Sequence, residues 1–206
     1  MTELDKIYGL FIMFWVALVS PGPNLAMILR ASAEHSRTDG FMVTLGLTSG
    51  VFIQGALGAL GLCWLFDVYP AALKVIQITG AIYLTYLGFR GLMTKKAPQT
   101  EKTEYTYQKK SLAISFQLGL WTQLLNPFAT ISILSLFGIF YSHFAWVRSL
   151  YVAIFVVSYL VWYGALSLIL TNVHLQKKLF AQRHWIERIT GIALIYFAIK
   201  MVRASV

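Results

Sequence analysis

Long hydrophobic stretches without any acidic or basic residue alternate along the chain with short basic stretches. Five such uncharged stretches cover residues 7–29, 41–66, 75–89, 111–142 and 149–173. A membrane-spanning helix needs roughly 20 mostly apolar residues. A sixth apolar stretch, 189–199, is shorter, but Arg188 and Lys200 flank it and their long side chains can reach the membrane surface. The pattern predicts an all-α integral membrane protein with six transmembrane helices.

The composition argues against a water-soluble domain. Of the 206 residues, 58% are hydrophobic and 12% are charged, and the mean hydropathy is +0.67. Soluble domains carry roughly 25% charged residues, so the surplus apolar side chains have to face membrane lipid. Glu3 and Asp5 stand where a signal peptide would be basic. We therefore expect the first stretch to be a membrane segment and not a cleaved signal.

The distribution of basic residues predicts the orientation in the membrane. With six crossings, one side receives twelve basic residues: Arg30, Arg37, Arg90, Lys95, Lys96, Lys102, Lys109, Lys110, Lys177, Lys178, Arg183 and Arg188. The opposite side receives five: Lys6, Lys74, Arg148, Lys200 and Arg203. Because basic residues favour the cytoplasmic side, we expect both termini outside. The net charge of +9 could suggest a nucleic-acid partner, but the basic residues gather on one side of a membrane, so none is expected.

The chain divides into two similar halves. The only long polar stretch, 95–110, predicts a cytoplasmic linker between residues 1–94 and 111–206 of a single domain. Each half begins with an apolar stretch interrupted by proline, and its last apolar segment opens on Ile-Thr-Gly, at 78–80 and 189–191. The matching order favours a duplication. Three crossings per half is an odd number, which predicts the inverted three-helix repeats found in many secondary transporters.

The sequence Pro21-Gly22-Pro23-Asn24 predicts a break in the first membrane helix. A proline inside a helix removes a backbone hydrogen bond and clashes with the preceding turn, at a cost of about 3 kcal/mol or more. Hydrocarbon cannot satisfy the freed backbone groups, so such a break is tolerated where it is buried in protein or lines a cavity. The new helix end suits a carboxylate, and Asn24 can bond the freed backbone. The alternative is a simple kink or an ordinary helix end.

Asn126-Pro127 predicts the matching break in the second half. Gln123 lies three residues before Asn126, on the same face of a helix. Uncharged amides inside a membrane helix bond a neighbouring helix, which is the commoner role, or contact a solute. The position beside a break favours solute contact for Asn126 and leaves both roles open for Gln123.

Small residues in the second stretch predict close helix packing or a solute pathway. Gly46 and Gly50 form a small-residue stripe, and Gln54 shares the face of Gly50. On the pathway interpretation, these three residues shape the pocket for a solute side chain. Four further residues are expected to serve helix packing: Gly80, Tyr83, Gly88 and Gly191.

Candidate catalytic or metal-binding clusters are not evident in the sequence. Asp67 and Glu187 lie near the ends of apolar stretches, and Glu34 and Asp39 are assigned to the first cytoplasmic loop. The histidines show no metal-ligand spacing, and no nucleophile–base pair or glycine-rich phosphate loop is present. We expect no cofactor, no metal site and no enzyme activity.

These features resemble the LysE/RhtB family of bacterial amino-acid exporters. The resemblance lies in Ser-Pro-Gly-Pro-Asn at 20–24, the glycines at 40, 46 and 50, Gly80-x2-Tyr83-Leu84-x2-Leu87-Gly88, Phe116-x2-Gly119, Leu125-Asn126-Pro127 and Gly191. It implies a six-helix fold in the bacterial inner membrane and export of amino acids or their derivatives, exchanged against protons. Phe128 stands where the family often has lysine. In the branch that exports lysine and arginine, an acidic residue often occupies the position of Gly50, so its absence favours a neutral solute.

The sequence therefore favours a secondary transporter for neutral amino acids such as homoserine, threonine or leucine. We expect the half-helix led by Asn24 to meet the solute carboxylate, while Asn126 and carbonyls freed by Pro127 meet the ammonium group. Three alternatives stay open: an exporter of another small solute or a metal ion, a membrane enzyme, and a non-transporting scaffold or channel subunit. Substrate identity, coupling ion and oligomeric state, a homo-oligomer included, are also left open.

Overall fold

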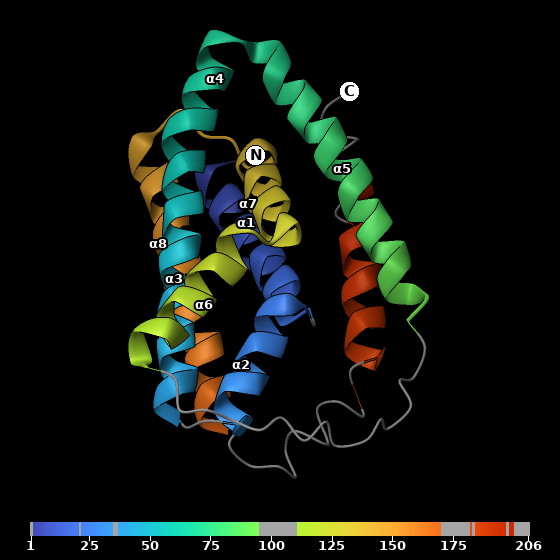
Figure 1. Ribbon diagram of the computed structural model, residues 1–206. Helices are drawn as coiled ribbons and strands as arrows, with labels where there is room; N and C mark the ends of the chain where they lie inside the picture. The colour runs from blue at the N-terminus through green and yellow to red at the C-terminus, as the bar shows by residue number, and fades with distance from the viewer. Residues whose placement is uncertain are drawn as a thin grey trace.

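The computed structural model describes residues 2–20, 22–34, 37–94, 111–169, 182, 184–196 and 198–199. Pro21, the predicted linker 95–110 and residues 200–206 lie outside these described residues. The described elements are helical: α1 (Glu3–Val19), α2 (Pro23–Glu34), α3 (Arg37–Leu57), the π-helical turn η1 (Gly58–Leu62), α4 (Cys63–Val68), α5 (Pro70–Leu92), α6 (Leu112–Leu124), α7 (Pro127–Ile139) and α8 (Ala145–Ile169). Residues 184–196 form a further helical segment, and Figure 1 shows the arrangement.

Polar residues and prolines fix where several helices begin. Thr2 and Asp5 form a capping box at the start of α1, with Thr2 Oγ1 accepting from the Asp5 N–H at 3.2 Å. Ser111 Oγ caps α6 by accepting from the Ile114 N–H at 3.4 Å. Pro70 and Pro127 are the first residues of α5 and α7, where a helix needs no N–H donor. Local sequence therefore sets these helix ends.

Two helical stretches in the described structure are long and apolar enough to cross a membrane, Arg37–Gly61 and Ala145–Ile169. A third candidate is the pair Leu112–Leu124 and Phe128–Ile139, which meet at a bend of 54°. Large apolar side chains such as Leu60 (77% exposed) and Trp64 (63% exposed) lie on the surface, as suits contact with lipid. The structure thus agrees with a helical membrane protein. Six crossings in two inverted repeats stay a prediction.

α3 is the central helix and packs against α6 and α8 (Figure 1). A Cβ atom added to Gly46 would collide with the Phe116 carbonyl of α6, and one added to Gly119 would collide with the Val43 carbonyl of α3. The backbones of α3 and α6 are therefore in direct contact at their crossing, which only glycine allows. This contact holds α6 firmly against the middle of the bundle.

α5 and the helical segment 184–196 lie beside each other, away from α3, α6 and α8 (Figure 1). A Cβ atom on Gly88 would lie 2.7 Å from the Gly191 carbonyl oxygen, and one on Gly191 would lie 2.6 Å from the Gly88 carbonyl oxygen. The two glycines therefore let these helices pack closely. Gly80 also lies in α5, and the half-buried Tyr83 ring lies 6.5 Å from the ring of Tyr86.

The assignment of Asp39 and Glu34 to a loop is wrong, because both residues lie in helices. Glu34 is the last residue of α2, and α3 begins at Arg37, so Asp39 lies in the first turn of α3. The Asp39 side chain is buried, and Ser115 Oγ of α6 donates a hydrogen bond to its Oδ1 at 2.9 Å. A carboxylate is stabilised in the first turn of a helix by the exposed N–H groups there. The connection between α2 and α3 is thus far shorter than the charge pattern indicated.

Candidate functional site

The first predicted break is bounded by the end of α1 and the start of α2. α1 ends at Val19, and Ser20, its C-cap, has extended backbone angles. α2 begins at Pro23, and Gly22 between them lines a pocket described below. Asn24, one residue into α2, is 5% exposed. The first polar side chain after this break therefore points into the protein.

The second break, between α6 and α7, is closed by the side chain of Asn126. As the N-cap of α7, Asn126 accepts at Oδ1 from the N–H of Phe128 at 3.1 Å and of Ala129 at 3.4 Å. These N–H groups have no partner within the helix, so the cap stabilises the start of α7. Because the oxygen serves the helix, Asn126 offers other partners its Nδ2 group.

Gln54 of α3 adds a hydrogen bond at the second break, where the Gln123 carbonyl also accepts from the Asn126 N–H at 3.2 Å. Proline has no N–H for the carbonyl four residues earlier, which is that of Gln123. Gln54 Nε2 donates to this carbonyl at 3.1 Å and to Thr130 Oγ1 at 2.7 Å. Gln54 therefore joins the two sides of the break. The Gln123 carbonyl, which we expected to be free for a solute ammonium group, is already bonded.

Asn24 connects the first half of the chain to the second. Its Nδ2 donates to Gln123 Oε1 at 2.7 Å and to the Tyr159 hydroxyl at 3.3 Å, and its Oδ1 accepts from Asn126 Nδ2 at 3.3 Å. The Tyr159 hydroxyl also donates to Gln123 Oε1 at 3.1 Å, and Gln123 Nε2 donates to Gln54 Oε1 at 2.7 Å. We call Asn24, Gln54, Gln123 and Asn126 the amide cluster; none is more than 6% exposed.

Hydrogen bonds in the amide cluster run in one direction. The cap on α7 fixes the Asn126 oxygen against backbone N–H groups, so its NH2 group donates to Asn24. Asn24 then donates to Gln123, and Gln123 donates to Gln54. Amide orientations are assigned from their partners, and here the helix start admits one orientation because N–H groups cannot accept. One cap therefore orients four side chains.

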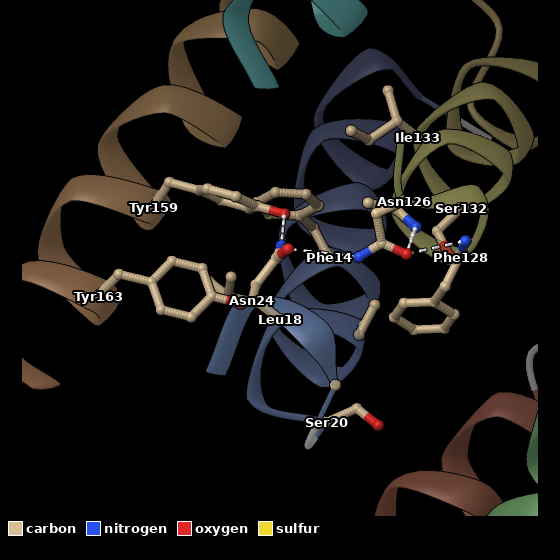
Figure 2. Close-up of a pocket in the computed structure, with 13 residues that line it drawn as sticks. Phe14, Leu18, Ser20, Asn24, Asn126, Phe128, Ser132, Ile133, Tyr159 and Tyr163 are labelled. Carbon is tan, nitrogen blue, oxygen red and sulfur yellow. Dashed lines mark hydrogen bonds between the residues drawn. The ribbon is translucent and has the colours of Figure 1, made fainter. Parts of the chain in front are cut away.

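A pocket lies among α1, α2, α7 and α8, and Asn24 and Asn126 both line it (Figure 2). The pocket is small. The space that the centres of water molecules can occupy in it is about 30 Å³, enough for about two waters. A whole amino acid is larger. The helices around the pocket therefore have to move apart before such a solute can enter.

Aromatic side chains form much of the pocket wall. Tyr159 and Tyr163 of α8 lie across from Phe128 and Ser132 of α7 in Figure 2. Phe14 of α1 stacks on Tyr159, with ring centroids 5.8 Å apart. Among the described residues, the pocket lining contains no Asp, Glu, Lys or Arg. A bound solute would meet amides, hydroxyls and aromatic rings.

Sequence reasoning missed Tyr159, Tyr163, Thr130 and Ser132. The tyrosines are four residues apart, so they share one face of an otherwise aliphatic helix, and this spacing could have drawn attention to them. Thr130 lies one turn after Asn126. For Ser132 we find no sequence signal, because several serines lie in the same apolar stretch.

The glycine stripe on α3 lies outside the pocket. Gly46 contacts the α6 backbone, and a Cβ atom on Gly50 would lie 2.7 Å from Cβ and Cγ of Gln123. Gly50 therefore makes room for Gln123, and Gln54 acts through the same side chain. Gly50 and Gln54 therefore contact Gln123 on the α3 side of the amide cluster, and none of these α3 residues lines the pocket.

Comparison with known proteins places the chain in a family. Residues 15–205 match the family model of the LysE type translocators. The chain belongs to this family. It is 29% identical to an uncharacterized membrane protein of Haemophilus influenzae over 94% of both chains. It is also 26% identical to the threonine efflux protein of Escherichia coli, over 91% of this chain and 92% of the other.

A leucine efflux protein of Klebsiella pneumoniae is 26% identical over 58% of this chain and 56% of its own. No solved structure matches the chain significantly. The resemblance to the LysE/RhtB exporters is confirmed, and amino-acid efflux is supported at the level of the family. Within the described part of this LysE type translocator, no group of three or more His, Cys, Asp or Glu residues is placed to hold a metal ion.

Proposed function

We propose that the protein exports a neutral amino acid from the cytoplasm and that the pocket is its solute site. One observation carries this proposal: Asn24 and Asn126, each beside one of the predicted proline breaks, bond each other at 3.3 Å and line the same pocket. Irregular backbone at membrane depth is tolerated where it is buried in protein or lines a cavity. The named efflux relatives support a neutral solute, since threonine and leucine are both neutral.

The direction of the hydrogen bonds revises which end of the solute each amide meets. Asn126 uses its oxygen on α7 and presents N–H, which suits the solute carboxylate and not its ammonium group. The ammonium group lies over the faces of Tyr159 and Phe14, because aromatic faces attract cations. A zwitterion without further charge fits a lining that has no ionised side chain, since an unpaired buried charge costs several kcal/mol.

Transport requires the pocket to open to each side of the membrane in turn. In our proposal, α1–α2 and α6–α7 each form one broken crossing of six, and the two halves are inverted repeats in the inner membrane. Rocking one half against the other widens the pocket on one side at a time. Protons moving inward drive the export.

Efflux of labelled threonine and leucine from vesicles containing the purified protein tests the proposal. Asn24→Ala removes the bonds to Gln123 and Asn126, and we expect export to fall by about tenfold or more. Gln117→Ala, which removes an exposed amide on α6, is the matched control and should export normally. Normal export by a folded Asn24→Ala protein contradicts the assigned site. Collapsing the imposed proton gradient should stop export by the unmodified protein.

The orientation has its own test. With Cys63 replaced by alanine, a cysteine at Thr2 should react with an impermeant reagent added outside the cell. A cysteine at Thr94, beyond the end of α5, should react only after the membrane is opened. Labelling of both from outside would contradict an odd number of crossings between them.

A further inference from the structure

The Ser132 hydroxyl stands out among the polar groups of α7. Ser132 is 6% exposed and lines the pocket, yet its Oγ has no hydrogen-bond partner in the described structure. Serine and threonine in helices commonly bond the carbonyl four residues earlier. Thr44, Thr48 and Thr130 do so, at 2.8–3.0 Å. The Ser132 hydroxyl, in contrast, is buried without such a bond.

The surroundings of Ser132 indicate where its partner comes from. Its neighbours along the α7 side of the pocket, Phe128, Ala129 and Ile133, have no polar side-chain atom. Buried polar groups in proteins are nearly always hydrogen-bonded, so a group without a protein partner points to a bound molecule. In Figure 2, Ser132 lies on the α7 side of the pocket, across from Tyr159. A molecule inside the pocket, either water or a solute, can therefore supply the missing partner.

We propose that Ser132 hydrogen-bonds the side chain of the exported solute and so selects neutral amino acids with a hydroxyl or amide side chain over aliphatic ones. This inference rests on the proposed function. The backbone ends of the solute already have partners in Asn126 and the aromatic wall, which leaves Ser132 for the side chain. The named relatives include both a threonine and a leucine efflux protein, and Ser132 favours a solute of the first kind.

The selectivity has a physical basis in the unpaired hydroxyl. A solute that pairs with it satisfies a buried donor and acceptor, whereas an aliphatic solute of equal size seals it away from water without a partner. Sites that hydrogen-bond a substrate group discriminate strongly against analogues that lack the group. Threonine and valine have nearly the same shape and differ by one hydroxyl against one methyl. Their export rates therefore isolate this contact.

Competitive efflux of labelled threonine and valine from vesicles tests the inference. We expect the unmodified protein to prefer threonine by about tenfold or more, and Ser132→Ala to reduce the ratio to near one with valine export kept. Ser135→Ala is the matched control, because Ser135 is a buried α7 serine outside the pocket lining. An unchanged ratio in Ser132→Ala overturns the inference while the proposed function stands. Export of neither solute by the unmodified protein overturns both.

Thermal unfolding in detergent gives a second readout that a purely structural serine would not produce. Removing an unpaired buried hydroxyl should leave the Tm of Ser132→Ala equal to or above that of the unmodified protein. Added threonine should raise the Tm of the unmodified protein and of Ser135→Ala, and that of Ser132→Ala by clearly less. A fall in Tm on Ser132→Ala, with an undiminished response to threonine, would show that the hydroxyl serves the fold or holds only water.

Discussion

The regions around 20–24 and 123–127 contain the same kinds of residue, but the two asparagines serve different helices. Asn126 caps its own helix, and Gln54 bonds the Gln123 carbonyl of α6, so the second break is stabilised on both sides. Asn24 instead sends its side chain across the bundle, to Gln123 of α6 and the hydroxyl of Tyr159 on α8.

This difference separates a local role from a tertiary one. The cap at Asn126 needs only α7, and it sets the direction of every later hydrogen bond in the amide cluster. Asn24 gains its partners only when α2, α6 and α8 are assembled. Substitutions at the second break should therefore affect both stability and export, whereas substitutions on the Asn24 side should affect mainly export.

Asn126→Ala should have the largest effect. It removes the cap, worth about 1–2 kcal/mol, and leaves the Asn24 oxygen without its donor, at a cost of about 1–3 kcal/mol. Unfolding in detergent should show a larger loss of stability than for Asn24→Ala, and export should be abolished. Asn126→Asp retains the capping oxygen but buries a carboxylate that repels both the Asn24 oxygen and the solute carboxylate, so it should also lose stability and fail to export. Equal stability losses for the two alanine variants would break the comparison.

Gln54→Met should have the next largest effect. It removes the hydrogen bonds that Gln54 makes with the Gln123 carbonyl and with the Gln123 side-chain amide. The free energy of unfolding should therefore fall by about 1–3 kcal/mol. Gln117→Met replaces an exposed glutamine on α6 and should leave stability unchanged. If Gln54→Met unfolds like the unmodified protein, the second break does not depend on α3.

Tyr159→Phe tests the Asn24 side alone. The substitution keeps the ring in the pocket wall and removes one hydroxyl that bonds Asn24 and Gln123. Stability should fall by about 0.5–1.5 kcal/mol, the net value of an ordinary hydrogen bond, while the KM for export rises. Tyr8→Phe, at a position 66% exposed, is the control. A stability loss as large as that of Asn126→Ala would show that both breaks are equally structural.

The smallest effect concerns the contact between the start of α1 and Ser142, which follows α7. Lys6 and Ser142 donate hydrogen bonds to Glu3, with Ser142 Oγ 2.7 Å from Oε2, and together they hold the pKa of Glu3 below its ordinary value of 4.5. Because the pKa is lowered in the folded protein, this contribution to stability is complete above pH 4.5 and is lost as the pH falls through the folded value.

Melting in detergent should therefore show a small drop in Tm below pH 4.5 for the unmodified protein. Glu3→Gln, which has no carboxylate to protonate, should show less of this drop. The effect is small because Glu3 lies near the surface, where solvent screens the ion pair with Lys6. An identical pH profile for both proteins would show that the hydrogen bond between Glu3 and Ser142 contributes nothing to stability.

Much of the helical organisation could be predicted from sequence because its causes are local. Runs of apolar residues indicate membrane segments, and prolines and capping residues mark helix ends such as Pro70, Ser111 and Asn126. The same reasoning drew attention to the amide cluster, since an amide inside an apolar run needs a partner wherever it lies. This reasoning misplaced Asp39, because a single carboxylate next to basic residues gives the same sequence pattern in a loop and at the start of a helix.

By itself, then, the sequence determined that this is a helical membrane protein and which polar residues need partners. Only the tertiary structure decided which residues those partners are. Asn24 and Gln123 are 99 residues apart in the chain, yet Asn24 Nδ2 lies 2.7 Å from Gln123 Oε1 because α2 and α6 pack beside each other. It also decided that Gly46 serves a helix crossing, and that Ser132, unlike Ser135, lines the pocket. The physical reason is that solvation and helix propensity act on each residue locally, whereas hydrogen-bond pairing and pocket lining depend on how distant helices are placed.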